Sequence, residues 1–190
     1  LKFYCFKKKG YGYQKILAKS QIDFQFSMVD SDNSFPSTFS YSLTNISVNQ
    51  LLSNIFSCVR EFWLYSTAQI RLYDENKYPV LEYDIYTEED ALKMVDEVMC
   101  YMEKEALPFL ESISDLKVIE KLINEMPVPE KAHVGIVLAK LMGNPEYENL
   151  KLVYKELIKD WAGDYNPDYD KIVSFLDSHS HEELIQIAGL

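Results

Sequence analysis

The sequence contains little of the material from which known catalytic sites are built. It has only six glycines among 190 residues. It also contains no glycine-rich phosphate loop, HExxH helix, CxxC pair or GxSxG elbow. No histidine neighbours the serine-rich stretch of residues 27–57, so spacing indicates no Ser-His pair. We therefore assign no catalytic residue and no cofactor, and a hydrolase with an unrecognised site stays an alternative.

Cysteines and long apolar runs are also scarce. Cys5, Cys58 and Cys100 are odd in number and widely spaced in apolar surroundings, which predicts small buried side chains rather than a disulfide framework. We therefore expect a reducing cytoplasm. No run of 18 apolar residues and no signal-peptide pattern occurs, so we expect neither a membrane span nor secretion. Because the sequence begins at Leu1 without a methionine, a targeting signal on a preceding segment stays open.

Potential metal ligands gather near the C-terminus, but their spacing favours a structural role. The group comprises Asp177, His179, His181, Glu182 and Glu183. Ser180 and Glu183 fit an S-x-x-E capping box, which places both glutamates in a first helical turn and both histidines in the connecting loop. Two histidines two residues apart on a loop are weak evidence for a metal. We predict no metal site.

The charges are divided unevenly along the chain. Residues 1–22 contain six lysines and no acidic residue, a charge of +6, whereas the remainder has 13 basic and 30 acidic residues, a charge of −17. An acidic body repels phosphates, so nucleic-acid binding over the whole surface is disfavoured. A basic protein is the expected partner of such a body. The charge pattern does not indicate the oligomeric state.

The basic N-terminal stretch mixes lysines with aromatic residues. Its candidate binding residues are Lys7, Lys8, Lys9, Tyr11 and Tyr13. Such residues bind single-stranded nucleic acid by stacking bases and neutralising phosphates. The same lysines, followed by Gly10, also fit the end of a helix over residues 1–6, where cations complement the helix dipole. We favour the structural interpretation and keep weak nucleic-acid or anion binding as an alternative.

Alternation of apolar and polar residues predicts strands before residue 87. The clearest run covers residues 21–28, where Ile22, Phe24 and Phe26 share one face. Residues 11–18 and 39–44 predict two more strands, and a loss of phase near residues 44–45 indicates a bulge or the strand's end. Residues 49–62 fit a short helix. Residues 68–72 and 81–85 predict a hairpin around the loop at 74–77.

Helical spacing begins at residue 87. Thr87 is the predicted N-cap, followed by three acidic residues. The predicted buried stripe comprises Leu92, Val95, Met99, Met102 and Ala106. Pro108 is expected to end or kink this helix. The substitutions Phe24→Asp and Val95→Asp are then each expected to unfold the protein, because each would bury a charge.

Further helices are predicted after this point. Ser114 is the expected cap of the next helix, and proline signals at Pro129, Pro145 and Pro167 open three more. We expect His133, early in one of them, to be half-exposed. The predicted fold is α+β. Residues 1–126 are expected to form an antiparallel sheet of about five strands, with the long helix packed on it. A helical C-terminal subdomain over residues 127–190 is expected to pack on it as one compact unit.

Three short stretches resemble a known family. They are FKKKG at residues 6–10, IDFQFS at 22–27 and ALPFLE at 106–111, with a serine-rich strand between the last two. Over residues 1 to about 125 the chain resembles the bacterial family catalogued as domain of unknown function 4304. The resemblance implies a bacterial, cytoplasmic domain of uncharacterised function and supplies no catalytic residue.

The functional hypothesis that follows is a non-enzymatic interaction module. Its acidic surface would bind a basic partner, as an immunity-type protein does when it neutralises a toxin. The alternatives are weak nucleic-acid or anion binding through the N-terminal stretch and a hydrolase with an unrecognised site.

Overall fold

The fold is α+β, as the sequence predicts. A computed structural model describes residues 7–9, 12–17, 19–30, 34–56, 68–69, 81–159 and 165–190. The chain divides into two units, a sheet unit of residues 1–44 and 68–114 and a helical unit of residues 45–67 and 115–190. The border between the units therefore lies at residue 114 rather than 126, and an inserted segment of the first half belongs to the helical unit.

The sheet unit contains six strands in its described part. They are β1 (Lys7–Lys9), β2 (Gly12–Ile16), β3 (Ser20–Met28), β4 (Phe35–Asn45), β5 (Ala68–Gln69) and β6 (Leu81–Ile85). The order across the sheet is β1-β2-β3-β4-β5, and β6 also pairs with β4. β1 is antiparallel to β2, β2 to β3, and both β5 and β6 to β4.

The predicted alternation places one face of the sheet in the core. Ile22 and Phe24 on β3 and Phe39 and Leu43 on β4 are buried. The Phe39 ring lies with its centroid 5.5 Å from that of Phe24 and 4.8 Å from that of Phe26. This aromatic cluster confirms the inward face predicted for residues 21–28 at Ile22 and Phe24, with Phe26 half-buried, but Met28, predicted on the same face, is exposed. Phe24→Asp is still expected to unfold the protein.

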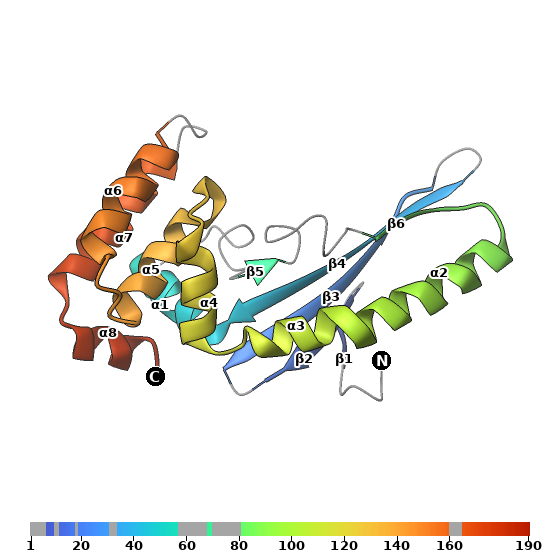
Figure 1. The fold of residues 1–190 in the computed structure, drawn as a ribbon, viewed down its shortest axis with the longest axis horizontal. Helices are drawn as coiled ribbons and strands as arrows, with labels where there is room; N and C mark the ends of the chain where they lie inside the picture. The colour runs from blue at the N-terminus through green and yellow to red at the C-terminus, as the bar shows by residue number, and fades with distance from the viewer. Residues whose placement is uncertain are drawn as a thin grey trace. The chain divides into compact units, whose positions relative to one another are not determined.

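A long helical segment runs alongside the sheet (Figure 1). It consists of α2 (Glu88–Tyr101), a π-helical stretch (Met102–Ala106) and α3 (Leu107–Ser112). Pro108 was expected to end or kink this helix; it does not end it, since helical structure continues through the π stretch into α3. The wider π stretch ends at Ala106, two residues before the proline, and Leu107 N–H donates to Met102 O, five residues back.

The helical unit is built around one central helix. Its helices are α1 (Ile46–Phe56), α4 (Leu116–Glu125), α5 (Ala132–Leu141), α6 (Tyr147–Leu157), α7 (Tyr165–Ser178) and α8 (His181–Ile187), with a 3-10 turn at Pro129–Lys131. Helix α5 contacts α1, α4, α6, α7 and α8. Every residue from Ala132 to Ala139 is buried, as expected for a helix that is apolar on all sides.

Several sequence predictions are wrong at the level of elements. Lys7–Lys9 form a strand rather than the end of a helix, and the helix expected over residues 1–6 lies outside the described residues. In the described residues, the strands β5 and β6 both pair with β4, and no pairing between the two as the predicted hairpin is seen. Asp115 rather than Ser114 caps α4, accepting a bond from the Lys117 N–H at 2.7 Å. In the described part of the chain, no helix is long and apolar enough to cross a bilayer.

Single residues also differ from their predictions. His133 is buried rather than half-exposed, because it lies on the central helix α5 with its ring 6.3 Å from that of Tyr169. Cys100 is exposed rather than buried, while Cys5 and Cys58 lie outside the described residues. The strand's end expected near residues 44–45 is confirmed, since Asn45 caps α1 there.

Candidate functional site

The α2 helix has a well-defined start. Thr87 Oγ1 accepts a hydrogen bond from the Asp90 N–H at 3.1 Å, and Asp90 Oδ2 accepts one from the Thr87 N–H at 2.9 Å. The Thr87 side chain also donates to Asp90, and these bonds hold the pKa of Asp90 below its usual value. The predicted cap is therefore confirmed as a reciprocal capping box.

The inner face of α2 packs on the sheet. Met94 and Val98 are buried, and the helix contacts β6. From β6 the Tyr83 hydroxyl donates a hydrogen bond to the Glu97 carboxylate; burial, and then this bond, raise the pKa of Tyr83. These contacts determine which side of α2 is left for solvent.

Part of the predicted apolar stripe lies on that solvent side. The side chains of Leu92 and Val95 are 62% and 47% exposed, and Met99 is half-buried. The buried positions are instead Met94 and Val98, which continue at Met102. The prediction that Leu92 and Val95 form the buried face is therefore wrong, and so is the expectation that Val95→Asp must bury a charge.

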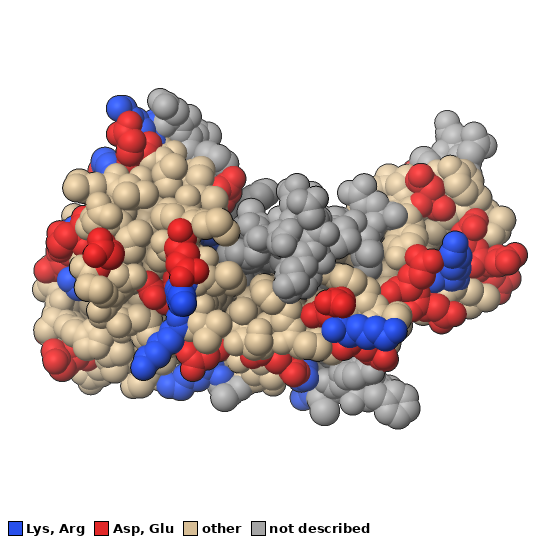
Figure 2. Space-filling view, in the orientation of Figure 1, with Lys and Arg blue, Asp and Glu red and all other residues tan. Residues whose placement is uncertain are grey.

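Acidic side chains surround this exposed apolar row. The exposed acids from α2 through the π stretch are Glu88, Glu89, Asp96, Glu97, Glu103 and Glu105. Only Lys93 and Lys104 oppose them, and Lys93 lies 3.8 Å from Glu97. Figure 2 shows carboxylates gathered over this region. We call the surface formed by Leu92, Val95, Met99, Glu88, Glu89, Asp96 and Glu103 the α2 outward face.

A shallow, open depression borders this face. It has a volume of about 470 Å³, and its lining comes from α2 and the π stretch: Asp96, Glu97, Cys100, Tyr101, Lys104 and Glu105. One of these groups, Glu97, already binds Tyr83 and Lys93. A depression on one helical segment offers no enclosed site in which catalytic groups converge from several elements.

The described N-terminal candidates do not share one side of the sheet. Lys7 pairs with Gln14 and Lys8 with Tyr13, so pleating directs the Lys7 and Lys8 side chains to opposite faces. Tyr13 is half-buried, with its ring centroid 6.4 Å from that of Phe24. Lys9 pairs with Gly12, and Tyr11 lies outside the described residues. Nucleic-acid or anion binding by this stretch stays a prediction.

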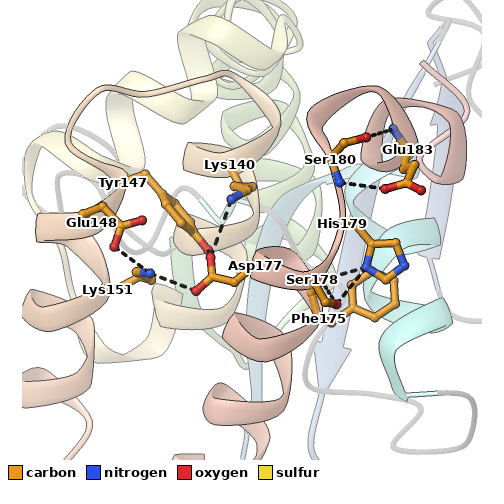
Figure 3. Close-up of polar contacts among 10 residues, drawn as sticks. All are labelled: Lys140, Tyr147, Glu148, Lys151, Phe175, Asp177, Ser178, His179, Ser180 and Glu183. Carbon is orange, nitrogen blue, oxygen red and sulfur yellow. Dashed lines mark hydrogen bonds and ion pairs between the residues drawn. The ribbon is translucent and has the colours of Figure 1, made fainter.

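The helical unit contains a second polar cluster, centred on Tyr147 (Figure 3). The Tyr147 hydroxyl donates to Asp177 Oδ1 at 2.8 Å, and Lys151 Nζ lies 2.9 Å from Asp177 Oδ2. Lys140 and Lys151 lie over the Tyr147 ring, 4.5 and 5.0 Å from its centroid. Glu148 lies 2.7 Å from Lys151. The cluster thus joins α5, α6 and α7 with two cations and two anions.

The ionisation of this cluster favours a structural role. Burial, and then the hydrogen bond to Asp177, raise the pKa of Tyr147 far above its usual value. Burial opposes ionisation of Asp177, but Lys151 and Tyr147 outweigh it and lower the pKa of that carboxyl. At neutral pH the tyrosine is therefore a protonated donor and the aspartate a charged acceptor. Neither is suited to act as a general base toward an external substrate.

Asp177, His179 and Glu183 of the C-terminal group are engaged in local contacts, and His181 begins α8 rather than lying in the connecting loop. His179 Nδ1 lies 2.8 Å from Phe175 O, and its ring stacks on that of Phe175 at 4.2 Å (Figure 3). Glu183 accepts the Ser180 N–H at 2.7 Å, which confirms the predicted capping box. Within the described ranges, no three His, Cys, Asp or Glu side chains form a group that could hold a metal ion.

Sequence patterns identify some of these contacts and miss others. The i, i+4 spacing of Tyr147 and Lys151 would have indicated that they lie on one side of α6. The contribution of Asp177, 30 residues away on α7, carries no local signal. The exposed position of Leu92 and Val95 was missed because their spacing equally fits a buried stripe.

No protein-family model matches the chain, and neither does any curated protein or solved structure. The resemblance to domain of unknown function 4304 therefore stays a prediction.

Proposed function

We propose that this protein is a non-enzymatic interaction module that binds a basic partner protein through the α2 outward face. The observation that carries the proposal is the exposure of Leu92 and Val95 in the middle of an acidic surface. When a partner covers exposed leucine and valine side chains at helical spacing, their removal from water favours binding.

The charge of the surface determines which partner is favoured. From residue 88 to 106 the chain has seven acidic residues and two lysines, a charge of −5. Such a surface attracts basic proteins at long range and repels nucleic acids. A toxin neutralised by an immunity-type protein is one partner of this chemistry.

The test is capture of partners from an extract of the native host at low salt. We expect the immobilised protein to retain basic proteins and to release them as the ionic strength rises, because screening weakens the attraction. The variant Asp96→Lys/Glu103→Lys should lose most of the captured material. A matched variant in the helical unit, Glu125→Lys/Glu156→Lys, makes the same change of net charge elsewhere and should retain it.

Recovery of no partner, or of acidic partners alone, would contradict the proposal. So would equal losses in the two charge-reversal variants, since the binding would then depend on net charge rather than on α2.

A further inference from the structure

The α2 outward face carries a pattern that is specific to one kind of partner. Leu92, Val95 and Met99 follow one another at spacings of three and four, so they form a row about 10 Å long, exposed at Leu92 and Val95 and half-buried at Met99. Such a row forms a ridge of the kind that packs into the groove of a second helix.

Carboxylates lie along the row within one helical turn. Glu88 and Asp96 lie four residues on either side of Leu92, and Glu103 lies four residues beyond Met99. All three are exposed. A partner that covers the row must therefore place cations at the edges of its own apolar stripe.

Alternative occupants fit this face less well. A second copy of the chain would bring Glu88, Asp96 and Glu103 against the same carboxylates, which repel one another. An added β-strand needs unpaired backbone N–H and C=O groups, whereas those of α2 are used within the helix. An anionic lipid surface or nucleic acid is repelled by the charge.

We propose that the α2 outward face binds a cationic amphipathic helix, whose apolar stripe covers Leu92, Val95 and Met99 and whose lysines or arginines pair with the flanking acids. This inference rests on the function proposed above and specifies the form of the basic partner.

The experiment measures binding of two synthetic peptides to the full chain by fluorescence anisotropy. The probe is an 18-residue peptide of leucine and lysine, with leucines three and four residues apart along one helical face. The control peptide has the same composition, with its leucines distributed around the helix. We expect the probe to bind at least tenfold more tightly than the control.

Protein variants then separate the apolar row from the charges. Leu92→Ser/Val95→Ser should weaken binding of the probe at least tenfold. The apolar control is Leu152→Ser/Val118→Ser, which changes side chains 72% and 44% exposed in the helical unit and should alter binding less than twofold. If the double variant does not melt cooperatively, the single variant Leu92→Gln replaces it, and a smaller loss of probe binding is then expected. Asp96→Lys/Glu103→Lys should also weaken binding at least tenfold at low salt.

The outcomes distinguish this inference from the function on which it rests. If both peptides bind equally, or if Leu92→Ser/Val95→Ser binds as wild type does, the helical partner is ruled out. The acidic interaction module would still stand if host partners depend on Asp96 and Glu103. If the probe does not bind while a host partner does, the inference alone falls. If neither binds, both proposals fall.

Discussion

Gly135 shows how one missing side chain allows two helices to pack. A Cβ at this position of α5 would lie 2.2 Å from the hydroxyl oxygen of Tyr154 on α6 and 2.9 Å from Asn124 Oδ1. Tyr154 is fully buried and donates to Asn124 Oδ1 at 2.8 Å, and Asn124 Nδ2 donates to Gly135 O at 3.1 Å. The glycine, which costs a helix about 1 kcal/mol, therefore admits a hydrogen-bonded tyrosine.

We predict that Gly135→Ala lowers the free energy of unfolding by about 2 kcal/mol, because overpacking outweighs the gain in helix propensity. Tyr154→Phe alone should cost about 1 kcal/mol for the lost hydrogen bond. The double variant should be less destabilised than the sum, since the closest clashing atom, the hydroxyl, is absent, while the ring carbon Cζ at 2.6 Å remains. Urea unfolding of the four proteins measures this coupling.

Gly143 supplies the control. It has φ of +63° and open space around its Cβ position, so Gly143→Ala should cost about 1 kcal/mol through backbone strain, without coupling to Tyr154→Phe. Strict additivity of Gly135→Ala and Tyr154→Phe would contradict the packing argument.

Because Lys131 is buried, we predict that the free energy of unfolding rises with pH. Its side chain is buried, and burial lowers its pKa from 10.5 to about 8, although Glu130 opposes the shift. Between those two values the unfolded chain binds more protons than the folded one, so stability increases with pH above about 8. At neutral pH the buried charge costs at most about 3 kcal/mol.

Lys131→Met should therefore raise the free energy of unfolding at pH 7 by about 1 to 3 kcal/mol and remove the increase between pH 8 and 9.5. Urea unfolding at several pH values measures both effects. Lys121→Met, at a side chain 74% exposed, should leave the pH dependence unchanged. A rise that persists in Lys131→Met would show that another group titrates.

At the scale of the helix, the π stretch explains why the buried stripe was mispredicted. The residues buried from α2 to α3 include a column in which each member lies four residues after the preceding one: Met94, Val98, Met102, Ala106 and Leu110. In a regular α-helix four residues turn about 40° too far, so such a column would rotate away from the sheet. The π stretch at Met102–Ala106 turns less per residue and partly offsets that drift. A search at period 3.6 joins Met102 and Ala106, which are buried, to Leu92, Val95 and Met99 instead of to Met94 and Val98.

We predict that this stretch tolerates loss of a residue. Deleting exposed Glu105 would convert it to a regular α turn, after which the apolar residues return at spacings of three and four. The deletion variant should stay soluble and melt cooperatively. Deleting exposed Cys100 should abolish the transition, because it turns Met94 and Val98 about 100° away from Met102 within a regular helix. Circular dichroism melts measure both, and equal loss of the transition would contradict the argument.

Pairing between strands shows a second limit of prediction from sequence. The alternation that marked residues 68–72 and 81–85 as strands is confirmed for the described parts of both segments, β5 and β6. Their partner is nevertheless β4, which pairs at Ser42 and Leu43 with β5 and at residues 35–39 with β6. Alternation determines which side chains face the core, but it contains no information about which neighbour supplies the hydrogen bonds.

For the molecule as a whole, the decisive segment is α1. The chain leaves the sheet after β4, and Asn45 Oδ1 caps α1 by accepting the N–H groups of Ser47 and Val48 at 3.0 and 3.2 Å. Helix α1 then contacts α5, α7 and α8, and Val48, Leu51 and Leu52 are fully buried. The sheet and helical units are thus interleaved along the sequence.

Interleaving predicts that a fragment ending at residue 126 does not fold as a stable domain. It would retain α1 but lack α5, α7 and α8, so three buried apolar side chains would be left without their neighbours, at about 1.5 to 3 kcal/mol each. We expect this fragment to aggregate or to melt without cooperativity. Replacing residues 45–67 by a flexible Gly/Ser linker in a fragment ending at residue 114 should restore solubility, because the orphaned helix is then absent. Ultracentrifugation and thermal melts distinguish these outcomes. A monomeric, cooperatively folded 1–126 fragment would show that α1 does not depend on the rest of the helical unit.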